Sequence, residues 1–172
     1  NRISNVEETA VPLLEAGAVP VLLKVVDTEA PGSRCRKHAC EALWGISVAD
    51  ANGVPMQKAG TVQMMVGVVG EEAKGSRCRE AACSVLCYLA CHEENKGAIL
   101  AGGVIDAVKE VVIGEEQGSE CRATLCTVLT HIAKGCDLDT SDSADEADRI
   151  RVGAGCATGN NGIARVVFFF DP

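Results

Sequence analysis

Apolar residues recur along the chain at helical spacing, and small or polar residues interrupt them at regular intervals. Between residues 39 and 46, apolar side chains stand three and four positions apart, the spacing of one buried helix face. The same arrangement returns after 43 residues and again after a further 43. The equivalent positions are Cys40, Cys83 and Cys126, then Leu43, Leu86 and Leu129, and then Ile46, Leu89 and Ile132. A fixed period of this length is typical of helical repeat proteins, whose stacked units share a continuous core.

Glycine and serine residues divide each repeat into three expected helices. An Ala-Gly dipeptide is expected to end a short first helix, because Gly tolerates the left-handed conformation beyond a helix end. This dipeptide stands at residues 16–17, 59–60 and 101–102. A second helix is expected over residues 18 to about 26, 61 to about 69 and 103 to about 113, with Pro20 in the first turn of the first of these. A longer third helix follows in each unit, with its N-cap at Ser33, Ser76 or Ser119.

Composition and charge exclude several classes of protein. The 172 residues are 47% apolar but only 3% aromatic, which disfavours a β-sandwich and favours helices packed through small side chains. The net charge of −8 argues against nucleic-acid binding, since neutralising phosphates requires a basic face. No apolar run reaches the ~18 residues that a membrane span needs, so we expect a soluble chain without a membrane partner.

The repeated sequence resembles the armadillo family. The residues that carry the resemblance read EAGAVPVLL at 15–23 and ACEALWGIS at 39–47, and the similarity extends over roughly residues 1–134. The resemblance implies an all-α fold, a right-handed α-solenoid of three-helix repeats. It also implies a non-catalytic scaffold that binds a peptide or partner helix along the concave surface of its third helices. Counting back one period places residues 1–4 at the tail of a third helix, so we expect a chain that starts inside a repeat and is a fragment of a larger protein.

The resemblance also indicates which residues would face a partner. In the family, an Asn near the end of each third helix commonly holds an extended peptide, but here Gly45, Tyr88 and His131 occupy those positions. Importin-α-like members carry a Trp one turn earlier, where this chain has other residues, so binding of nuclear localisation signals is not expected. The expected partner-binding residues are Lys37, Glu41, Trp44, Ser84, Tyr88, Thr127 and His131. For Trp44, filling a gap between repeats is an equal alternative.

Each repeat carries an Arg in the first turn of its third helix, where the positive end of the helix dipole disfavours a cation. These are Arg36, Arg79 and Arg122. A Glu stands seven residues before each Arg, at positions 29, 72 and 115. We expect Glu–Arg pairs, within or between units, that join the end of a second helix to the start of a third. The alternative is solvated charges, worth at most ~1 kcal/mol.

The ten cysteines are expected to act as small buried hydrophobes. Equivalent cysteines of neighbouring repeats should lie ~8–10 Å apart, beyond the ~7 Å Cα limit of a disulfide. Unpaired thiols indicate a reducing compartment, so the expected location is cytoplasmic, with the nucleus as an alternative. Cys83, Cys87 and Cys91 beside His92 could begin a metal site, but no Cys-x-x-Cys pair accompanies them, and we interpret them as core residues. No metal or cofactor is expected.

The period breaks near residue 134. Residues 135–152 are an acidic, Ser-containing insertion, expected to be a flexible loop. Its acids and serines fall at calcium-loop spacing, but Asp142 stands where the sharp turn needs Gly, and Asp148 replaces the bidentate Glu. Residues 153–172 contain glycine-rich strings similar to phosphate loops, yet too few residues follow them for a βαβ unit. We interpret residues 153–172 as a partial, degenerate terminal repeat.

Three functional hypotheses follow. The preferred one is a non-catalytic scaffold that binds a protein or peptide, since no catalytic arrangement is evident in the sequence. The second is an architectural or oligomerisation arm of a larger regulatory protein, which would self-associate through the open ends of the solenoid. The third is a calcium-responsive module that uses the acidic residues 137–148.

Overall fold

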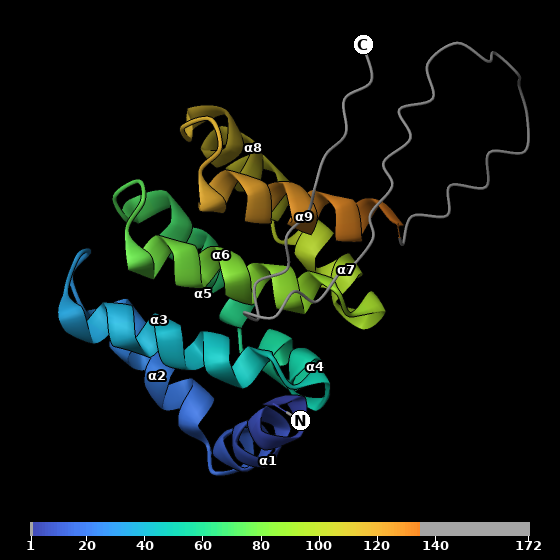
Figure 1. The fold of residues 1–172 in the computed structure, drawn as a ribbon. Helices are drawn as coiled ribbons and strands as arrows, with labels where there is room; N and C mark the ends of the chain where they lie inside the picture. Colours follow the sequence, from blue (N-terminus) through green and yellow to red (C-terminus); the bar gives the residue numbers. More distant parts are fainter. Residues whose placement is uncertain (1, 135–172) are drawn as a thin grey trace, which may run out of the picture. The chain divides into compact units, whose positions relative to one another are not determined.

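Helices make up most of residues 2–134, which are the residues that the computed structural model describes, with side chains described from residue 8 (Figure 1). No β-strand occurs in this range, so the all-α prediction is confirmed for it. The helices recur in threes, and we call them first, second and third helices by their place in each unit. The first helices are α1 (Arg2–Glu15), α4 (Gly53–Lys58) and α7 (Glu93–Ala101). The second helices are α2 (Ala18–Thr28), α5 (Thr61–Glu71) and α8 (Val104–Gly114). The third helices are α3 (Arg34–Ser47), α6 (Arg77–Ala90) and α9 (Glu120–Lys134).

The helix boundaries follow from glycine and serine chemistry. Gly17, Gly60 and Gly103 have φ of 79°, 85° and 70° and precede the three second helices. In the third unit the left-handed residue is therefore Gly103, one position beyond the expected Gly102. The hydroxyl oxygens of Ser33, Ser76 and Ser119 each accept a hydrogen bond from the backbone N–H three residues on, at 3.1–3.2 Å. These three N-caps confirm the expected starts of the third helices.

The beginning of the chain differs from the expectation. We expected residues 1–4 to be the tail of one helix and a separate short helix to end near residue 16. Instead α1 runs without a break through Arg2–Glu15 and contains Pro12. The later units have a 3-10 turn at Asp50–Asn52 or a break at Cys91 and His92 before the short helix. No Gly or Pro stands between residues 2 and 11, so nothing in the sequence interrupts α1 there.

Helices of the same rank pack against one another. Helix α6 lies between α3 and α9, α5 contacts both α2 and α8, and α4 contacts α7 (Figure 1). The core between these layers is built from Leu, Val, Ile, Met, Ala and Cys side chains. Cys40 and Cys83 are fully buried, whereas the equivalent Cys126 is half-buried. The reason is that, within residues 2–134, no further third helix lies on the outer side of α9.

No single helix of this part of the chain is both long and apolar enough to cross a membrane, and only the bent pair Glu8–Glu15 with Ala18–Thr28 passes that test, when its two helices are taken together. The acidic insertion 135–152, with its calcium-loop spacing, and the terminal repeat expected at 153–172 lie outside the described residues.

Candidate functional site

The seven residues expected to bind a partner all lie on the third helices. They are Lys37, Glu41 and Trp44 on α3, Ser84 and Tyr88 on α6, and Thr127 and His131 on α9. Each is at least partly exposed, and Trp44 keeps 37% of its surface in solvent. Because α6 lies between α3 and α9, the seven residues belong to one layer of three packed helices. We call this set the third-helix surface; its role in binding stays a prediction.

Several residues of the third-helix surface are held by their own helices. The Glu41 carboxylate contacts His38 Nδ1 at 2.9 Å. The hydroxyl of Ser84 donates to the backbone oxygen of Glu80 at 3.0 Å, and Thr127 donates to that of Ala123 at 3.1 Å. These hydroxyls keep acceptor capacity for a partner, because each has donated its single proton.

His131 is linked to the neighbouring helix. Its Nε2 atom lies 3.5 Å from the Sγ atom of Cys91, which follows the last residue of α6. Burial lowers the pKa of His131, and Lys134 and Lys96 lower it further. The imidazole is therefore neutral at pH 7 and can accept a hydrogen bond from a thiol.

Buried arginines and glutamates join neighbouring units, as expected. Arg36 Nη2 donates to Glu71 Oε2 at 2.6 Å and Nη1 lies 3.5 Å from Glu72 Oε1. In the next unit, Arg79 Nε lies 2.9 Å from Glu115 Oε1. The pairs therefore run from the Arg of one unit to the Glu of the following unit. Burial disfavours the charged form of Arg36, but the hydrogen bond and charge of Glu71, with the charge of Glu72, outweigh burial and raise its pKa.

Two of the six residues that were expected to form Glu–Arg pairs do not form one among the described residues. Glu29 accepts a hydrogen bond from the Ser33 hydroxyl at 2.8 Å instead. Within residues 8–134, Arg122 has no ion pair, and the position one period after Glu115 is occupied by Thr158, which carries no charge. Glu72 has a further role, since both its carboxylate oxygens accept from the backbone N–H of Gly32 at 3.2 Å. Glu72 thereby also fixes the turn between α2 and α3. This second role of Glu72 was not predicted from the sequence.

Sequence reasoning also missed two buried asparagines that connect the units. The Nδ2 of Asn52 donates to the backbone oxygens of Ala10 and Ile46, at 3.1 and 2.8 Å. The Nδ2 of Asn95 donates to those of Gly53 and Leu89, at 3.1 and 3.0 Å. The two asparagines are 43 residues apart, and so are their acceptors, Ala10 with Gly53 and Ile46 with Leu89. That spacing was a signal that could have identified both asparagines before the structure was known.

The cysteines only partly follow the expectation of burial. Cys40, Cys78, Cys83 and Cys121 are buried, but Cys35 and Cys91 are exposed, so for these two the expectation was wrong. The cysteines that touch are not the repeat equivalents: Cys78 Sγ lies 3.5 Å from Cys40 Sγ, 38 residues away along the chain. Burial raises the pKa of Cys40 and of Cys78, which keeps both thiols protonated and unreactive.

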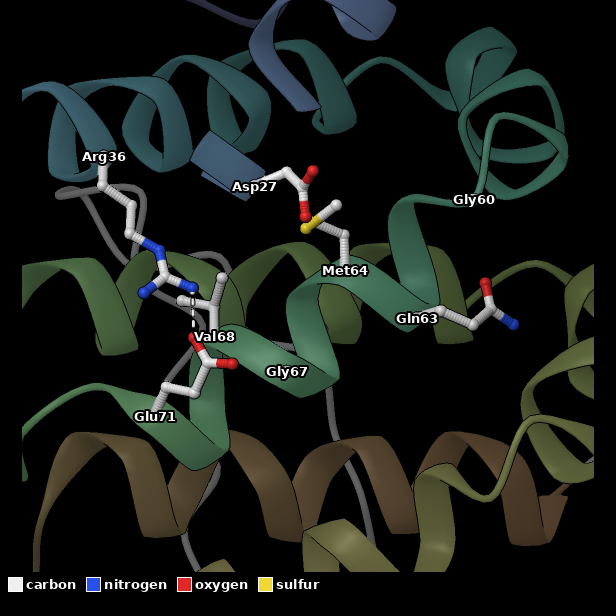
Figure 2. Close-up of a pocket in the computed structure, with 8 residues that line it drawn as sticks. All are labelled: Asp27, Arg36, Gly60, Gln63, Met64, Gly67, Val68 and Glu71. Atoms are coloured by element: carbon white, nitrogen blue, oxygen red, sulfur yellow. Dashed lines mark hydrogen bonds and ion pairs between the residues drawn. The ribbon is translucent and has the colours of Figure 1, made fainter. Parts of the chain in front are cut away.

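A hollow of about 320 Å³ lies between the second helices α2 and α5 (Figure 2). The Arg36–Glu71 pair closes one end of this hollow. The other polar side chains that line the hollow are those of Asp27 and Gln63. A second hollow of about 610 Å³ lies between α1, α2 and α3 and is mainly apolar; its lining includes Leu13, Val21 and Gly45. Neither hollow includes the residues of the third-helix surface.

The described residues contain no group of three or more His, Cys, Asp or Glu side chains that could hold a metal ion. The run of Cys83, Cys87 and Cys91 therefore does not form such a group with its neighbours. No family model, curated protein or solved structure matches this chain.

Proposed function

We propose that this chain is a right-handed, armadillo-type solenoid with a period of 43 residues, which binds an extended peptide or a helix of a partner protein along its third-helix surface. The function is display and not catalysis. The observation that carries the proposal is the single layer formed by α3, α6 and α9, on which all seven expected residues lie in partly exposed positions. A partner that lies across this layer can contact three successive units.

The buried contacts between units support this function. The pairs Arg36–Glu72 and Arg79–Glu115 have side chains that are at most 8% exposed, so they fix one third helix relative to the next unit. A surface that is rigid before binding loses little conformational entropy when a partner docks. The spacing of the exposed side chains is therefore set in advance.

The chemistry of the third-helix surface indicates a partner with both apolar and polar side chains. Trp44 and Tyr88 offer large amphipathic rings, and such residues are frequent hot spots of protein interfaces. Lys37 and Glu41 on α3 carry opposite charges, so the surface has no strong preference for an acidic or a basic partner. A displayed library of random peptides is therefore a suitable probe.

The test is selection of this peptide library on the folded chain, followed by affinity measurement on the double variant Trp44→Ala/Tyr88→Ala. We expect the selected peptides to lose at least tenfold in affinity, the effect of removing a hot spot worth about 2 kcal/mol. The matched control is Ile113→Ala, which removes an apolar side chain that is 82% exposed on a second helix. Peptides that bind the double variant normally but lose affinity for the control would overturn the proposal.

Self-association is a second candidate, favoured by the two unmatched charges. Among the side chains of residues 8–134, no Arg pairs with Glu29 of the first unit and no carboxylate pairs with Arg122 of the third unit. Head-to-tail stacking of two copies would unite them. Arg122→Glu and Glu29→Arg should each reduce the mass measured by light scattering, and an equimolar mixture of the two variants should restore association by pairing the swapped charges across one interface. A chain that is monomeric at every concentration would exclude this candidate.

A further inference from the structure

A thiol cluster lies where α6 ends against α9, and it consists of Cys87, Cys91 and His131. The residues 43 positions earlier are Trp44, Val48 and Tyr88, which carry no thiol or imidazole. The backbone is the same at both places: Val48 has φ −69° and ψ −24°, and Cys91 has φ −68° and ψ −23°. The fold therefore accommodates an ordinary apolar side chain at the position of Cys91, and its backbone does not require a thiol there.

Two contacts bring the cluster together. The Sγ atom of Cys91 is 3.5 Å from Nε2 of His131 and 3.3 Å from the backbone oxygen of Cys87, one helical turn earlier. Cys91 is exposed and Cys87 is half-buried, so a small molecule in solution can reach Cys91 first. In an ideal helix the Cα atoms of residues four apart lie about 6.2 Å from each other, within the range of a disulfide. Their Cβ atoms lie about 5–6 Å apart, farther than the ~4 Å that a disulfide needs, so the last turn of α6 must open for a Cys87–Cys91 bond to form. Cys91 is also the cap residue of α6, where the backbone is held by fewer helical bonds.

The surroundings of Cys91 favour its reactive thiolate form, mainly through a hydrogen bond. The hydrogen bond with the Cys87 side chain lowers the pKa of Cys91, and Lys96 contributes, whereas burial and Asp50 act in the opposite direction. His131, which is neutral at pH 7 because its pKa is lowered, lies on the α9 side, where its Nε2 atom can accept a proton from Cys91. A thiol with a lowered pKa and solvent access is the type that oxidants attack, whereas the buried Cys40 and Cys78 have raised pKa values.

We propose that Cys91 is a site of reversible oxidation by hydrogen peroxide, with Cys87 as the resolving thiol and His131 as the acceptor of the Cys91 proton. The Cys91 thiolate attacks one peroxide oxygen, the O–O bond breaks, and Cys91 sulfenic acid and water form. The Cys87 sulfur then attacks the Cys91 sulfur, the S–O bond breaks, and a second water leaves. In total, two thiols lose two protons and two electrons, and one peroxide becomes two waters. This inference does not depend on the proposed binding function.

The test is to treat the reduced, folded 172-residue chain with a slight excess of hydrogen peroxide and to map every cysteine by peptide mass. We expect a Cys87–Cys91 disulfide that dithiothreitol reverses. In the Cys87→Ser variant, Cys91 sulfenic acid should persist and be trapped by dimedone. Cys91→Val, which copies Val48, should yield neither product.

Two cysteines of the same chain serve as internal controls. Cys35 is exposed but lies outside the cluster, so it reports on exposure alone, and Cys40 is buried, so its protection shows that a variant is folded. His131→Tyr, which copies Tyr88, should slow oxidation of Cys91 roughly tenfold and leave the rate at Cys35 unchanged. As pH is raised, oxidation of Cys91 should also accelerate at a lower pH than oxidation of free cysteine in solution, because the pKa of Cys91 is lowered. Equal rates at Cys35 and Cys91, or an unchanged Cys91 rate in His131→Tyr with Cys40 still protected, would overturn the proposal.

Discussion

The two junctions between neighbouring third helices, α3 with α6 and α6 with α9, share their buried contacts but differ in their exposed ones. Both have an Arg–Glu pair and a buried pair of cysteines, Cys40 with Cys78 at the first junction and Cys83 with Cys121 at the second. The exposed end of the first junction carries Val48 and Tyr88, whereas that of the second carries Cys91 and His131. A buried charge or amide must keep its partner, but an exposed position is free to acquire new chemistry.

The buried ion pairs also differ between the junctions. Arg36 faces two carboxylates, Glu71 and Glu72. Arg79 faces only Glu115 among the described acids, because Gly114 stands where the preceding unit has Glu71. Arg79 gains the backbone oxygen of Glu72 as an acceptor, at 2.8 Å. The second junction therefore depends more heavily on one carboxylate.

The largest expected effect comes from removing that carboxylate. Glu115→Ala leaves the Arg79 guanidinium buried and without its counter-charge, which should destabilise the fold by about 3–5 kcal/mol. Glu71→Ala at the first junction should cost less than about 1 kcal/mol, because the Glu71 side chain is 58% exposed and Glu72 remains beside Arg36. Urea unfolding followed by circular dichroism measures both. Equal losses would show that the two junctions do not differ in this way.

The next effect concerns the asparagines, which we expect to be equivalent. Asn95→Ala removes two hydrogen bonds and leaves the backbone oxygens of Gly53 and Leu89 without that donor, so a loss of about 2–3 kcal/mol is expected. Asn52→Ala should cost the same within error, because it removes the same two contacts one unit earlier. A loss below 1 kcal/mol at either site would mean that water replaces the amide there.

A smaller effect tests a compensating pair of residues. A Cβ atom added at Gly53 would overlap the imidazole of His92, so the imidazole packs directly on this glycine. One unit earlier the corresponding residues are Ala10 and Ala49. Gly53→Ala should therefore destabilise the fold by about 1–2 kcal/mol, since overpacking displaces the ring. His92→Ala in the same chain should recover most of that loss, and a double-mutant cycle without coupling would contradict this.

The smallest effect is at the helix caps. Ser76→Ala removes the side-chain acceptor of the Arg79 N–H and should cost about 1 kcal/mol. Ser33→Ala should have an effect of similar size, although the Ser33 hydroxyl also donates to Glu29. Thermal unfolding of the two variants compares the caps directly. If either substitution left the unfolding temperature unchanged, burial of that third helix alone would fix where the helix starts.

Local chemistry explains why much of the fold could be predicted. Ser33 caps α3 by accepting a hydrogen bond from the backbone N–H of Arg36, three residues on, and Gly17 ends a helix because it adopts a positive φ. Neither effect depends on distant parts of the chain. Because the pattern repeats every 43 residues, each local prediction also applied to the equivalent residues of the next unit. The pairing of Glu72 and Glu115 with arginines was also accessible, because a cation at a helix N-terminus requires a compensating charge. Whether that charge came from the same unit or the next was left open.

The sequence by itself determined the second and third helices and the serine caps, because these depend on residues within a few positions of one another. The tertiary structure alone decided which side chains meet between units. Cys78 meets Cys40, Cys91 meets His131 and Arg79 meets Glu115, at separations of 38, 40 and 36 residues. None of these separations equals the period of 43, because a side chain reaches sideways to the helix packed beside it and not to its own equivalent. That offset is set by how neighbouring helices are shifted and rotated when they pack, which no local pattern records.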